Sequence, residues 1–139
     1  MTPPRSIEEI GPDAVMEHFG VSIERGIVEA DGLVIASFEV SDRVRQPFGI
    51  VHGGVYSAVA ESTCSIGTAA AVVPAGQIAM GQSNQASFLR PITDGVVRCE
   101  ANARHRGRST WIWDCDFTDE AARLLAVVRM TIAVRDAPA

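Results

Sequence analysis

Small and apolar side chains fill the chain from Val51 to Val73, and Glu61 is the one charged residue among them. The run opens with a histidine and two glycines and is stopped by Pro74 and Gly76. Its length and its lack of a polar face of any width predict a long helix buried inside the molecule. A carboxylate in the middle of such a helix is costly to bury, so we expect Glu61 to serve a purpose.

On either side of this helix the pattern predicts a short helix and six strands. Apolar and polar residues alternate, most clearly over 96–106, 110–118 and 123–135, which is typical of strands with one buried and one wet face. Turn signals such as Asp31-Gly32 and Asp94-Gly95 separate the strands. The expected elements are a helix over 6–19 that begins at Ser6 and is interrupted near Gly11, strands over 21–27, 33–40, 77–89, 96–106, 110–118 and 123–135, and a loop over 41–50.

The order of these elements predicts an α+β fold in a single domain over residues 1–139, with 1–20 as an N-terminal tail and short helix. After the long helix the strands read as an antiparallel meander. A curved antiparallel sheet wrapped around one long central helix buries the helix and covers its own apolar face, which is the arrangement called the hotdog fold. Open sheet edges and the apolar surface of so short a chain favour a homodimer or a higher assembly.

Composition narrows the possible partners. The chain of 139 residues has a net charge of -5, which argues against nucleic acid as a partner because phosphate binding requires a basic surface. Three cysteines, Cys64, Cys99 and Cys115, have neither a disulfide pattern nor zinc-ligand spacing, so no metal is expected and reduced thiols in a cytoplasm are the simplest interpretation. The N-terminus does not resemble a signal peptide. The long helix is not expected to span a membrane, because Glu61 lies near its centre.

The entry of the long helix is one candidate for chemistry. The first amides of a helix have no intrahelical partner, and the dipole adds partial positive charge there. A glycine at Gly53 would let a carbonyl oxygen approach such an amide, as in an oxyanion hole. The alternative is that Gly53 and Gly54 only make a tight turn.

Glu61 is the stronger candidate. Gly54, Ala58, Glu61 and Ser65 form one stripe of the helix, which could line a cavity. The alternative is a structural pair with an arginine from elsewhere. Glu61 and Gly53 are about 12 Å apart along a helix, so one copy cannot easily bring both to a single reacting centre. Two antiparallel copies could, and the site would then be shared between subunits.

Other candidates carry weaker signals. The amide of Gln46 could bind a carbonyl or a water, or belong to an ordinary loop. His52 could be a general acid for a leaving thiolate, or a turn residue that caps the loop. Cys64 is interpreted as a packed thiol, since no base pairs with it. Basic and hydroxyl residues that suit phosphate, or that guard a strand edge by charge, are Arg90, Arg108, Ser109 and Thr110.

Several of these segments together resemble the hotdog-fold acyl-coenzyme A thioesterases. The resemblance rests on Gln46, the segment 49–54, Glu61 and Ser65, and covers about residues 33–135. The segments 81–84, 87–91 and 109–114 are also similar to the glutamate-type 4-hydroxybenzoyl-CoA thioesterases, which have relatives in phenylacetate pathways.

The resemblance implies hydrolysis of an acyl-CoA, with an aromatic acyl group expected, and no separate cofactor. Glu61 would be the nucleophile or the general base, the Gly53 amide would polarise the thioester carbonyl, and Gln46 would orient substrate or water. His52 would assist the thiolate or fix the loop, and Ser65 stands where the family pattern has a threonine. Arg90, Ser109 and Thr110 would hold the CoA phosphates. At the turn before Ser109, Arg108 is a more basic residue than the family pattern has at this position.

Two other functions remain open from the sequence. Hotdog hydratases and dehydratases use a catalytic histidine in a different setting, and the only comparable histidine here is His52. Non-catalytic hotdog regulators bind acyl-CoA as a signal, but they carry a DNA-binding extension and tend to lose the acidic residue that Glu61 represents.

Overall fold

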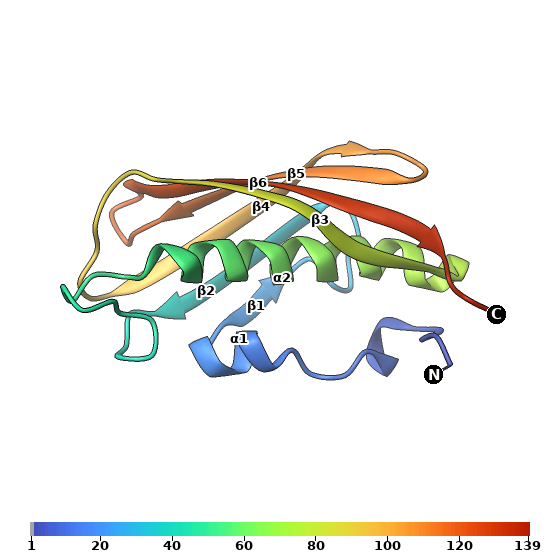
Figure 1. Ribbon diagram of the computed structural model, residues 1–139, viewed down its shortest axis with the longest axis horizontal. Coiled ribbons are helices and arrows are strands. Elements are labelled where there is room, and N and C mark those ends of the chain that lie inside the picture. Colours follow the sequence, from blue (N-terminus) through green and yellow to red (C-terminus); the bar gives the residue numbers. More distant parts are fainter. Residues whose placement is uncertain (1) are drawn as a thin grey trace.

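The computed structural model describes residues 2–139 and consists of one long helix laid against a single six-stranded sheet (Figure 1). The predicted α+β arrangement is therefore confirmed. The elements in chain order are the 3-10 helix η1 (Ile7–Glu9), helix α1 (Ala14–Phe19), strands β1 (Ser22–Arg25) and β2 (Leu33–Glu39), helix α2 (Gly53–Val72), the 3-10 helix η2 (Val73–Ala75), and strands β3 (Gln77–Phe88), β4 (Val96–Arg106), β5 (Thr110–Thr118) and β6 (Leu124–Asp136).

The N-terminal helix begins later than the sequence suggested. Ser6 precedes only the single turn of η1 and its side chain makes no capping bond. Asp13 is the N-cap of α1, where its carboxylate accepts hydrogen bonds from the amides of Val15 (2.9 Å) and Met16 (3.1 Å). A carboxylate placed after the Gly-Pro break satisfies the first orphan amides of the second segment. Gly20, at φ 69°, ends the helix as expected.

The sheet has the order β1-β2-β4-β5-β6-β3, and every neighbouring pair is antiparallel. The predicted meander is wrong for β3, which pairs with β6 and not with β4. The helix lies across the sheet (Figure 1). The chain therefore leaves α2 at the far edge of the sheet, where it forms β3, and must cross back to the side of β2 before it forms β4. Half of the residues of β3 are polar and none is buried, which is typical of such an edge.

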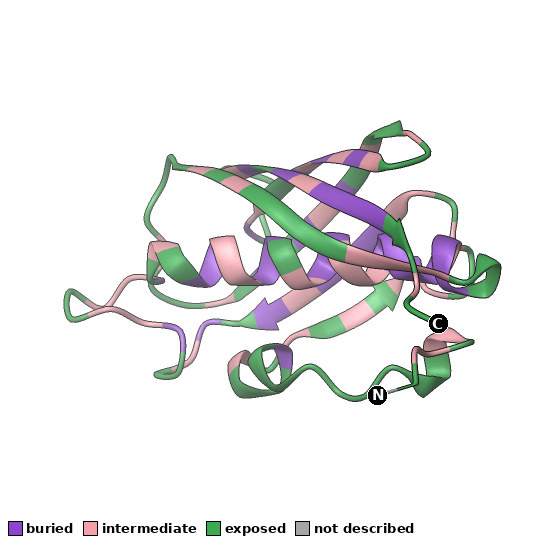
Figure 2. Ribbon diagram, turned by 45° about the vertical axis from the view of Figure 1, so that its right-hand side comes forward, coloured by how far each residue is buried: buried purple, intermediate pink, exposed green. Residues whose placement is uncertain are grey.

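The core lies between the sheet and α2. Side chains from all the inner strands point toward the helix, and the largest of those that are fully buried are Trp113, Phe38 and Phe117. Gly67 allows close approach, since a Cβ at this position would lie 2.6 Å from a methyl of Val34 and 2.8 Å from the ring of Trp113. Buried residues of the helix and of the sheet belong to one packed cluster, and Figure 2 shows buried stretches on α2 and on the strands.

The expectation that α2 is buried on all sides is wrong for the single chain. The residues that face the sheet are buried, but a single sheet covers only one side of a helix, and the other side stays open. The residues of this open face are His52, Gly54 and Glu61, which are exposed, and Ser57, Ala58, Ser62 and Ser65, which are half-buried. Glu61 therefore lies at the surface of the chain and not in its core.

By length and composition alone, the span Gly53–Ala75 would also suit a membrane helix, with a mean hydropathy of 1.2. However, 56% of its most apolar window is buried inside the fold. Its apolar character is explained by the sheet that covers it.

Candidate active site

The entry of α2 is fixed by His52. Its Nδ1 accepts a hydrogen bond from the amide of Gly54 at 2.9 Å, and its backbone oxygen accepts one from Val55 at 3.0 Å. The bond to Nδ1 places the ring proton on Nε2, which makes Nε2 a donor on an exposed side chain. His52 therefore caps the helix entry, which is one of the two roles expected from the sequence. Its Nε2 remains available for the other role, that of a general acid.

Gly53 carries an amide that makes no hydrogen bond within residues 2–139, because the cap engages Gly54 and Val55 instead. The residue is half-buried, and the ring of Phe88 lies against it. A Cβ on Gly53 would be 2.6 Å from that ring, so any side chain here would have to displace Phe88. The free amide, at the positive end of a 20-residue helix, can donate to an oxygen that gains negative charge.

Aromatic side chains line this entry. The rings of Phe88 and Tyr56 are stacked with centroids 6.1 Å apart, and Tyr56 also meets Phe117 edge to face at 5.1 Å. The Tyr56 side chain is buried, and its hydroxyl has no hydrogen-bond partner within the described residues. Burial raises the pKa of Tyr56 to about 12, so the phenol stays neutral. Sequence reasoning did not identify this aromatic group, because each ring alone looks like an ordinary core residue.

Glu61 lies two turns further along α2, on the open face. Its side chain extends to β3, where a Cβ added at Gly81 would be 3.1 Å from the carboxylate oxygen Oε1. Within residues 2–139 the carboxylate makes no ion pair and no side-chain hydrogen bond, so the structural pair with an arginine that was left open is not present in one chain. Ser65, one turn on, is half-buried on the same face.

Gln46 sits at the base of a tight loop. Its backbone amide donates to Ile50, and its side-chain oxygen accepts from the amide of Phe48 at 2.7 Å. The loop is closed by the bridge between Arg45 and Val51, directly before the helix. The side-chain oxygen of Gln46 is thus used in shaping the loop, and its amide nitrogen is left to meet a ligand.

The basic and hydroxyl residues fall into two places. Arg90 follows β3 near the N-terminal end of α2, whereas Arg108, Ser109 and Thr110 form the turn into β5. Thr110 pairs with Ala133, which pairs with a β3 residue ten positions before Arg90. At about 3.3 Å per residue the two groups are roughly 30 Å apart. One chain therefore does not bring them together on one ligand.

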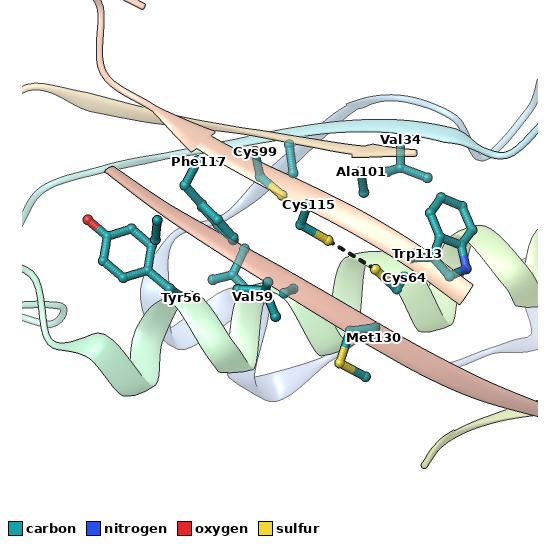
Figure 3. Close-up of a cluster of buried hydrophobic side chains, with 14 of the residues drawn as sticks. Val34, Tyr56, Val59, Cys64, Cys99, Ala101, Trp113, Cys115, Phe117 and Met130 are labelled. Carbon is teal, nitrogen blue, oxygen red and sulfur yellow. Dashed lines mark hydrogen bonds between the residues drawn. The ribbon is translucent and has the colours of Figure 1, made fainter. Parts of the chain in front are cut away.

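The three cysteines are packed thiols, as expected for Cys64. They gather between α2, β4 and β5, where the sulfurs of Cys64 and Cys115 lie 3.2 Å apart (Figure 3). Contact with neighbouring thiols and burial raise the pKa of both Cys99 and Cys115 well above the usual value. Such thiols are poor nucleophiles. Within residues 2–139, no cluster of three or more His, Cys, Asp or Glu side chains suits a metal ion.

Known proteins resemble this chain over most of its length. The model of the thioesterase superfamily matches residues 48–126. A 1,4-dihydroxy-2-naphthoyl-CoA hydrolase of Listeria monocytogenes is 39% identical over 83% of this chain and 88% of its own. The proofreading thioesterase EntH of Klebsiella pneumoniae is 34% identical over 88% of this chain and 86% of its own.

A solved structure carries the same fold. The thioesterase SAV0944 of Staphylococcus aureus superposes with a TM-score of 0.82 and 35% identity over 88% of this chain and 99% of its own. Its structures include variants in which one glutamine or one glutamate was replaced by alanine. Those two positions are as far apart in that sequence as Gln46 and Glu61 are here.

Proposed function

Since the chain belongs to the thioesterase superfamily and is a thioester hydrolase of the hotdog fold, we propose that it cleaves aromatic acyl-CoA thioesters with Glu61 as its catalytic carboxylate. The observation that carries the assignment of Glu61 is its setting. The carboxylate is exposed on the open face of α2 and has no cation partner within the described chain, and the same helix begins with the free amide of Gly53. Because no cation of the described chain holds it, the carboxylate stays free to act on a substrate that binds over this face.

An aromatic acyl group is supported by two independent features. The relative from Listeria monocytogenes is named for a naphthoyl thioester, which is aromatic. In this chain the rings of Phe88 and Tyr56 lie beside the Gly53 amide, where the acyl carbonyl would bind. Aromatic rings favour one another in stacked and edge-to-face arrangements. Phe88 is 56% exposed in the single chain and so has surface left to offer.

The reaction needs one water and no cofactor, because CoA enters as part of the substrate and leaves as a product. Either Glu61 attacks the thioester carbonyl and water then hydrolyses the resulting anhydride, or Glu61 takes a proton from the water that attacks. The Gly53 amide would stabilise the negative oxygen of the tetrahedral intermediate. Gln46 would orient the substrate or water through its amide nitrogen, and Ser65 would hold water.

His52 completes the proposed site at the leaving group. As the C–S bond breaks, CoA leaves as a thiolate that must gain a proton. The Nε2–H of His52, on an exposed side chain next to Gly53 in the sequence, could assist, while Nδ1 holds the helix entry. His52 can cap the helix whether or not it donates a proton to the CoA thiolate.

Two copies of the chain are needed to complete this site. Gly53 and Glu61 are about 12 Å apart along α2, so they cannot both reach one carbonyl. If a second copy lies antiparallel to the first, Glu61 of each chain faces Gly53 of the other. The unpaired edge of β3, which exposes Met80 and Phe88, would be covered together with the exposed Leu89 that follows it. We propose a homodimer, or a homotetramer built from dimers, working in the cytoplasm.

The same arrangement would unite the CoA-binding residues. Thr110 lies level with Met80, next to the β3 residue that Glu61 contacts, whereas Arg90 lies beside the Gly53 end. Antiparallel copies would therefore place Arg90 of one chain near Arg108, Ser109 and Thr110 of the other. Arginines and hydroxyls from both chains could then hold the CoA phosphates.

Release of free CoA from a panel of aryl-CoA and straight-chain acyl-CoA thioesters tests the proposal. We expect aryl substrates to have the higher kcat/KM, and Glu61→Gln to lower kcat by roughly 10³-fold or more, since it removes the group that attacks or activates water. The proposal fails if Glu61→Gln and the parent chain release CoA equally fast. Faster turnover of straight-chain than of aryl substrates would remove the aromatic assignment alone.

A further inference from the structure

The helix-facing residues of β3 contact α2 at three successive points. The ring of Phe88 lies on Gly53, the side-chain amide of Asn84 donates to the backbone oxygen of Ser57 at 2.9 Å, and Gly81 faces the Glu61 carboxylate. Residue numbers rise along β3 while they fall along α2, so the strand runs antiparallel to the helix. Figure 1 shows β3 starting near the C-terminal end of α2 and rising past the helix.

These contacts exist because β3 contains a bulge. Its register with β6 shifts between Gly81 and Ser83, so that Gln82 is the extra residue. Gly81 pairs with Ile132 and Asn84 pairs with Met130, and both partners are buried on the helix side of the sheet. Strict alternation would send the side chain of residue 84 to the opposite face from that of residue 81. The inserted residue restores Asn84 to the face that Gly81 occupies.

The Glu61 side chain occupies the space next to the Cα of Gly81. A Cβ on Gly81 would lie 3.1 Å from Oε1 and 3.4 Å from both the carboxyl carbon and Cγ of Glu61. The first distance is shorter than ordinary van der Waals contact and the other two lie at its lower limit, so a methyl group here must shift the carboxylate by a few tenths of an ångström. The backbone of Gly81 has no positive φ, so conformation does not demand glycine at this position. What a side chain at this position would meet is the Glu61 side chain.

We propose that Gly81 is a positioning residue, which together with the adjacent bulge and Asn84 holds the Glu61 carboxylate in its reactive place. Gly81 provides the flat surface on which the carboxylate rests. Asn84 fixes the turn of α2 that precedes it, since Ser57 lies one helical turn before Glu61. This inference rests on the proposed role of Glu61, and the experiment below separates the two.

Gly81→Ala and Gly81→Val form a graded series for steady-state kinetics of CoA release. A misplacement of 1 Å can cost about 10²-fold in rate, so we expect kcat to fall by roughly 10-fold for Gly81→Ala and further for Gly81→Val. KM should change by less than about threefold, because the substrate contacts remain. Gly11→Ala is the matched control, since a Cβ there meets nothing within 4 Å and its φ is ordinary.

A double-mutant cycle separates positioning from loss of stability. Glu61→Asp shortens the carboxylate and withdraws it from Gly81. The losses caused by Glu61→Asp and Gly81→Ala should then not multiply, because the shorter side chain no longer meets the new methyl. Losses that multiply, or a normal kcat in a folded Gly81→Ala protein, would overturn the inference. An unaffected Glu61→Gln variant would instead refute the proposed function itself.

Asn84 supplies the second arm of the test. Asn84→Ala removes the bond to Ser57 and should lower kcat more than it raises KM. Gln85→Ala, one residue on and exposed, is the control for a change on the same strand. Equal effects of Asn84→Ala and Gln85→Ala on kcat would show that Asn84 does not position α2.

Discussion

At the scale of single residues, His52 shows how one side chain can serve structure and chemistry separately. Its Nδ1 caps α2 through the amide of Gly54. An N-cap side chain accepts from the second or third amide of a helix, so the first amide, that of Gly53, stays free. The cap thus stabilises the helix entry without occupying the amide that the proposed site needs.

Two substitutions at His52 separate these roles. His52→Ala should lower the free energy of unfolding by about 1 kcal/mol through loss of the cap, whereas His52→Asn keeps a capping oxygen and should restore it. Urea denaturation measures the stability of each variant. We expect both variants to release CoA slowly, because neither keeps the imidazole Nε2–H that is proposed to assist the leaving thiolate. Recovery of most of the activity in His52→Asn would limit the histidine to its role as the cap.

At the scale of elements, the sequence predicted the strands well because their period-2 patterns are clear. The bounds of β4 and β5 match the predicted ranges, and the second hairpin strand buries Val34, Ala36 and Phe38 as expected. The neighbour of β3 was not predictable in the same way. The polar residues of β3 indicate an edge strand, but no local feature of the sequence indicates which edge of the sheet it forms. That depends on how α2 crosses the sheet.

The candidate site was likewise predictable where the signal is local and not where it depends on contacts between distant segments. Glu61, Gly53 and Gln46 stood out as residues with unusual types in unusual places. The residues that hold them did not, because Gly81 and Asn84 act through contacts between segments far apart in the chain. The open face of α2 was also missed, since the sequence shows that a helix is apolar but not that only one sheet is available to cover it.

Gly67 makes the packing of α2 on the sheet testable. Gly→Ala in a helix normally stabilises by up to about 1 kcal/mol. Here the new methyl would meet Val34 and Trp113 at less than 3 Å, and both belong to the closely packed core. We therefore expect Gly67→Ala to lower the free energy of unfolding by about 1–3 kcal/mol. A stabilised Gly67→Ala protein in urea denaturation would mean that α2 is not held against the sheet this closely.

At the scale of the whole molecule, the single chain is incomplete as a catalyst under the proposal. Its open helix face, its unpaired β3 edge and its separated basic residues all lack a partner, and one antiparallel copy would supply all three. An isologous pair has two identical sites, each with the helix entry of one chain and the carboxylate of the other.

Complementation tests this sharing. A chain with Glu61→Ala and a chain with Gly53→Val should each be inactive alone, the first through loss of the carboxylate and the second through collision with Phe88. A purified heterodimer contains one site with both groups intact and should show about half of the parent activity per dimer. Two differently tagged chains, co-expressed and purified through both tags, provide the sample. Activity no higher than that of the inactive homodimers would mean that each site lies within one chain.

The pairing of β3 with β6 also has a consequence during biosynthesis. The strand that contacts α2 at all three points is made directly after the helix, but its hydrogen-bonding partner, Leu124–Asp136, is translated after every other strand of the sheet. While the chain is still growing on the ribosome, β3 has no strand to join, and Glu61 has no fixed surface beneath it. The site is therefore assembled only after β6 has emerged and β3 can close against it.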